Sequence, residues 1–111
     1  MKERGRKLQW VQILELLDFN WHTTAGGRFV EAEGRVMNVS GRPLKNVEVI
    51  VIFLAESGEM VTSSAALISY NPILAGQMST FKVVTQHNPA MKDAAVEFKD
   101  LLGGSILTRN K

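Results

Sequence analysis

The sequence contains no cysteine, only three prolines and few aromatic residues, which make up 7% of its 111 residues. The absence of cysteine excludes disulfide bonds and metal sites built from thiolates. No run of about 18 apolar residues occurs, so we expect no transmembrane segment in this chain. The apolar content of 45% and the charged content of 22% are typical of a soluble globular protein of one domain.

The excess positive charge lies in the first residues of the chain. Residues 1–8 carry a net charge of +3, whereas the remainder carries −1. A nucleic-acid-binding domain usually has a basic stripe on its folded body, so we predict no nucleic-acid partner. We interpret residues 1–8 as a basic flexible N-terminal tail and residues 9–108 as a single domain.

The basic tail has two further interpretations. It could be the stub of a removed signal or membrane segment, or a polybasic contact to anionic lipid. A signal peptide has an apolar run of about 7–15 residues after its charged start, and none follows Met1–Arg4 directly. We therefore identify no signal peptide in this chain.

The segment Gln9–Trp21 fits two kinds of secondary structure. One set of apolar residues would form a helical stripe: Trp10, Ile13, Leu14, Leu17 and Trp21. Another set would share one face of a strand: Val11, Ile13, Leu17, Phe19 and Trp21. Because the rest of the chain has β patterns, we predict a strand with a bulge near Glu15.

Residues from Arg28 onward alternate as a half-buried strand does. Apolar or small residues occupy every second position from Val30 to Val36, and charged residues lie between them. Gly34 interrupts this strand, which predicts a bulge or a close backbone approach. Thr23–Gly27 precedes it as a turn whose two glycines can adopt positive φ.

The segment Val47–Leu54 is apolar on both faces after its glutamate, which predicts a central strand covered on both sides. Gly58 is expected in the left-handed position of the following hairpin. In the next strands Phe81 and Val83 should point inward. The remaining strands are expected over Met60–Ile68, Ser79–Gln86 and Ala94–Asp100, with a short one around Ile106 and Leu107.

Short strands separated by regular turn signals are typical of an all-β sandwich. We predict an immunoglobulin-like antiparallel β-sandwich of about seven strands. The Ser/Thr-rich segment Met60–Ile68 and the opening strand are the candidate edge strands. Unpaired backbone groups on such edges can pair with another chain.

Catalytic and metal-binding patterns are absent from the sequence. The two histidines, His22 and His87, both fall in predicted turns, and neither has a second ligand at helical metal spacing. Asp18 precedes His22 by four residues, but this spacing fixes no triad geometry. We predict no enzyme and no catalytic, cofactor-binding or metal-binding residues.

Some other polar and aromatic residues admit a functional interpretation. Glu31 and Glu33 share a face, and we interpret them with Arg28 and Arg35 as solvated ion pairs. The sequence Asn38-Val-Ser40 matches a glycosylation acceptor, which we interpret as incidental. Trp10 and Trp21 could form a stacking platform for a small ligand or carbohydrate, or they could belong to the core.

The central part of the chain resembles a known family. The motifs that carry the resemblance are Gly34-Arg-Val-Met-Asn38, Leu44-Lys-Asn-Val47 followed by its strand to Glu56, Gly58, Leu74-Ala-Gly-Gln77 and Phe81. They resemble the FxLYD-type domain over about residues 29–98. The chain has Ile52, Ala55, Glu56 and Ala75 where that family has Phe, Tyr, Asp and Pro.

The resemblance implies an immunoglobulin- or fibronectin-like sandwich of bacterial and archaeal envelope or secreted proteins. It therefore implies an extracytoplasmic location, and it offers no catalytic residues. Our leading hypothesis is a non-catalytic spacer or protein-interaction module that contacts another protein, or itself, through an edge strand. The alternative is a small-ligand or carbohydrate-binding module that uses Trp10 and Trp21.

Overall fold

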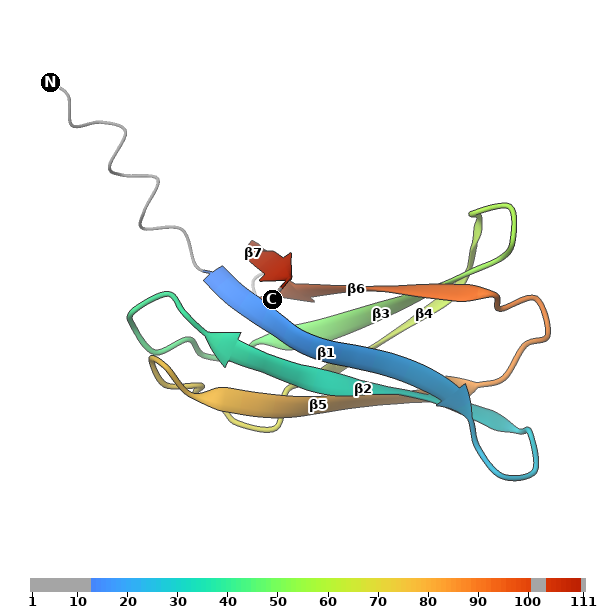
Figure 1. The fold of residues 1–111 in the computed structure, drawn as a ribbon, viewed down its shortest axis with the longest axis horizontal. Helices are drawn as coiled ribbons and strands as arrows, with labels where there is room; N and C mark the ends of the chain where they lie inside the picture. The colour runs from blue at the N-terminus through green and yellow to red at the C-terminus, as the bar shows by residue number, and fades with distance from the viewer. Residues whose placement is uncertain (1–12, 101–103, 111) are drawn as a thin grey trace, which may run out of the picture.

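The computed structural model describes residues 13–100 and 104–110, and within them every regular element is a β-strand (Figure 1). The segment 1–8 and Trp10 lie outside the described residues. No helix in the described part of the chain is long and apolar enough to cross a membrane. The strands are β1 (Ile13–Thr23), β2 (Phe29–Asn38), β3 (Glu48–Leu54), β4 (Met60–Leu67), β5 (Met78–Gln86), β6 (Asp93–Lys99) and β7 (Ser105–Asn110).

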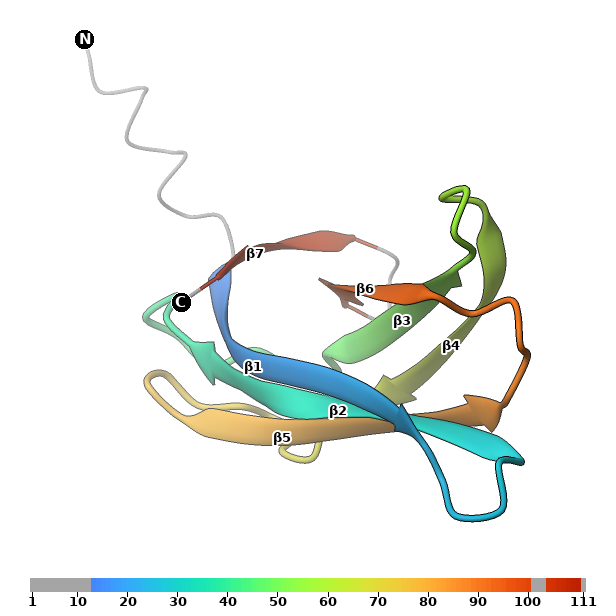
Figure 2. The same ribbon diagram turned by 45° about the vertical axis from the view of Figure 1, so that its right-hand side comes forward.

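The strands form two packed layers that β7 connects. Their order in the sheet is β4-β3-β6-β7-β1-β2-β5. Strands β1, β2 and β5 make one layer, and β4, β3 and β6 make the other (Figures 1 and 2). This arrangement confirms the predicted all-β sandwich with its seven strands.

Two pairings define the topology in more detail. Strand β7 is antiparallel to β6 and parallel to β1. The β1–β7 ladder therefore differs from the antiparallel arrangement that the sequence predicted. Strand β4 pairs with β3. In constant-type immunoglobulin domains the fourth strand instead lies beside the fifth, in the other layer.

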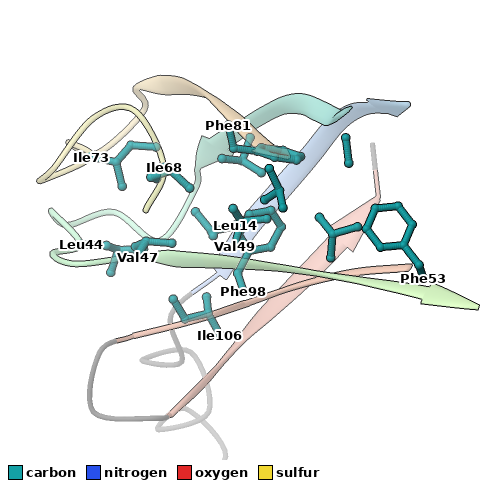
Figure 3. Close-up of a cluster of buried hydrophobic side chains, with 14 of the residues drawn as sticks. Leu14, Leu44, Val47, Val49, Phe53, Ile68, Ile73, Phe81, Phe98 and Ile106 are labelled. Atoms are coloured by element: carbon teal, nitrogen blue, oxygen red, sulfur yellow. The ribbon is translucent and has the colours of Figure 1, made fainter. Parts of the chain in front are cut away.

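The core lies between the layers and consists of alternate side chains from facing strands (Figure 3). Phe81 on β5 meets Phe98 on β6 edge to face, with ring centroids 5.5 Å apart. Val83 is also buried, so the predicted inward face of β5 is confirmed. The largest fully buried apolar side chains are Phe53, Phe81, Phe98, Leu14, Ile73, Val30, Val36, Val47, Val49 and Val51.

The opening segment is a strand from Ile13 to Thr23, so the helical alternative is wrong there. The first four residues of the predicted range Gln9–Trp21 lie outside the described residues. The β1–β2 register shifts between Leu16 and Asp18. The expected bulge near Glu15 is therefore present a little further along the strand.

Gly34 marks a close backbone approach, as its place in a strand predicted. A Cβ atom on this residue would collide with the carbonyl oxygen of Asp18 and lie 2.7 Å from the Cζ atom of Phe81. The predicted turn glycines also behave as expected. Gly26, Gly27 and Gly58 have φ values of 88°, 72° and 94°.

The sheet ends at β4 and β5. The prediction of an edge at Met60–Ile68 is therefore confirmed. The opening strand is not an edge over residues 14–16, because that part pairs with β2 on one side and with β7 on the other. The second terminal strand is β5, which was not among the edge strands predicted from the sequence.

The outer face of β3 is only half-buried, whereas the sequence predicted that both faces of this strand are covered. Val49, Val51 and Phe53 point into the core, whereas Ile50 and Ile52 are half-buried on the opposite face. Ile50 lies between Ala65 of β4 and Glu97 of β6 in the ladder. The outer side of this layer therefore carries an apolar row along its central strand.

Candidate functional site

The outer face of the β1–β2–β5 layer carries most of the polar residues to which the sequence draws attention. Antiparallel pairing places His22 opposite Glu31 and Asn20 opposite Glu33. Strand β5 adds Lys82, which lies opposite Glu33. Side chains directly opposite each other on one sheet face lie about 4.5–5.5 Å apart at Cβ, so this face brings the residues into contact.

A cluster of potential metal ligands lies at one end of this face. The ligand atoms of His22, Glu31 and Glu33 all lie within 4.8 Å of one another. The Nε2 atom of His22 lies 3.4 Å from Oε1 of Glu31, and Nζ of Lys82 lies 4.0 Å from the same oxygen. The sequence pattern predicts a turn position for His22, without a second ligand. The structure places it in β1 beside two carboxylates.

Asp18 and Arg35 form an ion pair at the other end of the face. Arg35 Nε donates a hydrogen bond of 2.7 Å to Oδ2 of Asp18, and Nη2 lies 2.6 Å from the same oxygen. This hydrogen bond and the carboxylate charge raise the pKa of Arg35, so the guanidinium remains charged at any physiological pH. Arg35 therefore pairs across strands with Asp18, whereas the sequence pattern predicted ion pairs with Glu31 and Glu33.

These contacts give His22 no triad partner. Asp18 is held by Arg35 and lies four ladder positions from His22, with Asn20 between them on the same strand face. The residues around the Asp18–Arg35 pair form a shallow pocket of about 230 Å³. Its lining includes Asn20, Glu33 and the edge of Phe81.

His87, the second histidine, follows β5 directly and is distant in sequence from His22. Its backbone N–H donates to the carbonyl of Arg28 at 2.9 Å. The predicted loop position of His87 is confirmed. His87 lines a cleft of about 500 Å³ between the start of β4 and the end of β5, together with Val61, Thr62, Thr85, Gln86 and Asn88.

Trp21 belongs to the packing between the layers. Its side chain is half-buried against the core, and its ring meets Phe53 edge to face at 5.7 Å with an interplanar angle of 73°. This contact favours the core interpretation of Trp21 over the stacking platform. Trp10, the other half of that platform, lies outside the described residues.

Asn38 is a structural residue of the connection between β2 and β3. Its side chain is fully buried and makes four hydrogen bonds. The Nδ2 group donates to the carbonyls of Arg42 at 2.7 Å and Ile73 at 3.0 Å, and Oδ1 accepts from Ser40. An amide nitrogen with both donors used inside the fold is not available for glycosylation, in agreement with the interpretation that the motif is incidental.

The free edge of β4 forms the second candidate surface. The N–H of Ile68 donates to the carbonyl of Val47, in line with the β4–β3 ladder. Because antiparallel hydrogen bonding alternates, the backbone groups of Ser63, Ala65 and Leu67 point away from β3. Beyond them, Ser69 N–H donates to the Thr80 carbonyl of β5 at 2.9 Å.

From that contact the two edge strands diverge toward the cleft beside His87 (Figure 2). Apolar side chains lie along this edge. Leu67 is 49% exposed and Met60 is 63% exposed. They lie at the two ends of β4, opposite Glu48 and Leu54 of β3. The sequence indicates this strand as an edge and β3 as apolar on both faces. The structure adds that the second apolar face of β3 is only half-buried.

Comparison with known proteins shows the fold and no more. The sequence matches no family model and no curated protein. The structure is similar to that of IrmA from Escherichia coli, with a TM-score of 0.54 over 90% of this chain and 92% of that chain. The sequences are 5% identical, so the similarity concerns the all-β fold alone.

Proposed function

We propose that the chain is a non-catalytic immunoglobulin-like module, a spacer or protein-interaction domain of a prokaryotic cell-envelope protein. The extracytoplasmic setting rests on the resemblance to the FxLYD-type domain. The interaction role rests on the free edge of β4, where unpaired backbone groups adjoin an apolar sheet face.

The geometry of β4 suits a partner that adds a strand. Main-chain hydrogen bonds to Ser63 and Ala65 would supply affinity that is independent of the partner's side chains. The exposed side chain of Leu67 and the outer row of β3 would supply selectivity for alternate apolar residues on the partner strand. The partner is therefore an extended segment of a protein, which can belong to another chain or to a second copy of this one.

Site-specific photocrosslinking in the producing cell tests this proposal. A photoreactive amino acid replaces Ala65 on the β4 edge, and the matched control replaces Ala25, which is also exposed, in the β1–β2 hairpin. We expect a discrete crosslinked product from position 65 and none from position 25. A product at twice the mass of the chain would identify self-association, and another mass would identify a different protein.

The Ser63→Pro variant, with the photoreactive amino acid kept at position 65, adds a second measurement. Proline at 63 removes an N–H that faces away from β3, so the domain should fold, and the edge should no longer accept a strand. The crosslink should then disappear while the circular dichroism spectrum stays unchanged. Equal crosslinking from positions 65 and 25, or none from 65, would overturn the interaction role. Recovery of the protein in the cytoplasmic fraction would overturn the envelope setting.

A further inference from the structure

We propose that His22, Glu31 and Glu33 form a binding site for a divalent transition-metal ion, with Zn²⁺ as the best match. The cluster combines the imidazole of His22 on β1 with the two carboxylates on the adjacent strand β2. The three ligand atoms lie within 4.8 Å of one another. Zinc binds such nitrogen and oxygen donors at about 2.0–2.2 Å, which places two ligand atoms about 3–3.5 Å apart. The 3.4 Å separation of His22 Nε2 and Glu31 Oε1 already meets this requirement.

The sheet holds these ligands in place. His22 and Glu31 are direct neighbours in the β1–β2 ladder, and Glu33 follows Glu31 on the same face of β2. The backbone positions are therefore fixed by paired strands, and only side-chain rotations are needed to close the ligand set. Sites on regular elements hold a geometry more accurately than sites on loops.

The chemistry of the donor set selects the class of ion. Imidazole binds zinc, copper and nickel well, whereas magnesium and calcium prefer ligand sets made of oxygen alone. Three protein ligands leave one tetrahedral position for water or for a group of a partner molecule. The side chain of His22 is 48% exposed, so this open position faces the solvent.

Lys82 is the cation that opposes metal binding. Its ammonium group lies 4.0 Å from Oε1 of Glu31 and would be displaced or repelled by a bound ion. Removing this charge should strengthen metal binding, because two like charges would no longer share one carboxylate. Substitution of Lys82 should therefore raise the affinity for the metal ion, whereas substitution of a ligand should lower it.

Isothermal titration of the full chain with zinc chloride, in a buffer without chelators, tests the proposal. We expect one zinc ion per chain, affinity lowered at least about tenfold by His22→Gln and by Glu31→Gln, and affinity raised by Lys82→Met. The matched control is His87→Gln, which removes the other histidine of the chain and should leave the affinity unchanged.

Ring resonances of the two histidines in NMR spectra provide the second readout. Zinc should shift the signals of His22 and leave those of His87 in place, and magnesium at the same concentration should shift neither. Binding that survives His22→Gln, that is lost equally in His87→Gln, or that magnesium reproduces would overturn the proposal. Circular dichroism of each variant excludes loss of fold as the cause.

Discussion

Gly34 lies opposite Phe81 in the β2–β5 ladder, and the Phe81 ring fills the space that a side chain at position 34 would need. The carbonyl of Asp18 closes the same space from β1, where the strand register shifts. The glycine is therefore required by close packing of three strands. Its backbone shows no positive φ that would by itself demand glycine.

The Gly34→Ala variant tests this packing. The new methyl group must displace backbone as well as the aromatic ring, so we expect a loss of about 1–3 kcal/mol in the free energy of unfolding. Urea denaturation measures it. Gly104→Ala is the matched control, because there the added Cβ would meet only the carboxylate end of Asp100 at 3.0 Å. Equal effects of the two substitutions would contradict the packing role of Gly34.

Phe81 itself should contribute strongly to stability. Its side chain is 2% exposed and contacts Phe19 and Phe98. We expect Phe81→Ala to lower the free energy of unfolding by about 3–5 kcal/mol, since it removes a large side chain and leaves a cavity. Val84→Ala on the exposed face of the same strand is the control and should change stability by less than about 0.5 kcal/mol. A loss below about 1 kcal/mol for Phe81→Ala would contradict the β5 register.

Local patterns in the sequence were enough to predict most of the strands. Alternation identified the inward face of β2, and the glycines at 26, 27 and 58 predicted the turns that their positive φ values confirm. These features depend on neighbouring residues only. The parallel β1–β7 ladder joins residues from the two ends of the chain, and no local pattern reports such a pairing.

The candidate metal site shows why pairing register matters. The sequence placed Glu31 and Glu33 on one face, but the turn signal at Thr23–Gly27 made His22 look like a turn residue. In the structure β1 continues to Thr23, because β2 pairs with it as far as Val30. A shift of one residue in this register would move His22 to the opposite face, away from both carboxylates.

Asn38 should be more important for stability than its position beside a turn suggests. Asn38→Ala would remove a fully buried amide that donates to the carbonyls of Arg42 and Ile73 and accepts from Ser40. The Ile73 carbonyl would keep only its hydrogen bond from the Leu44 N–H. We expect a loss of about 1–3 kcal/mol in the free energy of unfolding, measured by urea denaturation. Asn88→Ala is the comparison, because the Asn88 side chain accepts one exposed hydrogen bond, from the N–H of Ala90. A smaller loss for Asn38→Ala than for Asn88→Ala would contradict the anchoring role.

Trp21 can be distinguished from a ligand-stacking residue by its fluorescence. In the Trp10→Phe variant Trp21 is the only tryptophan, so the emission reports its environment alone. Because the indole packs on Phe53 and the core, we expect blue-shifted emission that acrylamide quenches weakly and that shifts to the red when urea unfolds the protein. Trp10→Phe/Phe53→Leu is the matched comparison, in which loss of the edge-to-face contact should shift the emission part of the way to the red. Solvent-like emission from Trp21 in the folded Trp10→Phe variant would contradict the core assignment and would favour the carbohydrate-binding alternative.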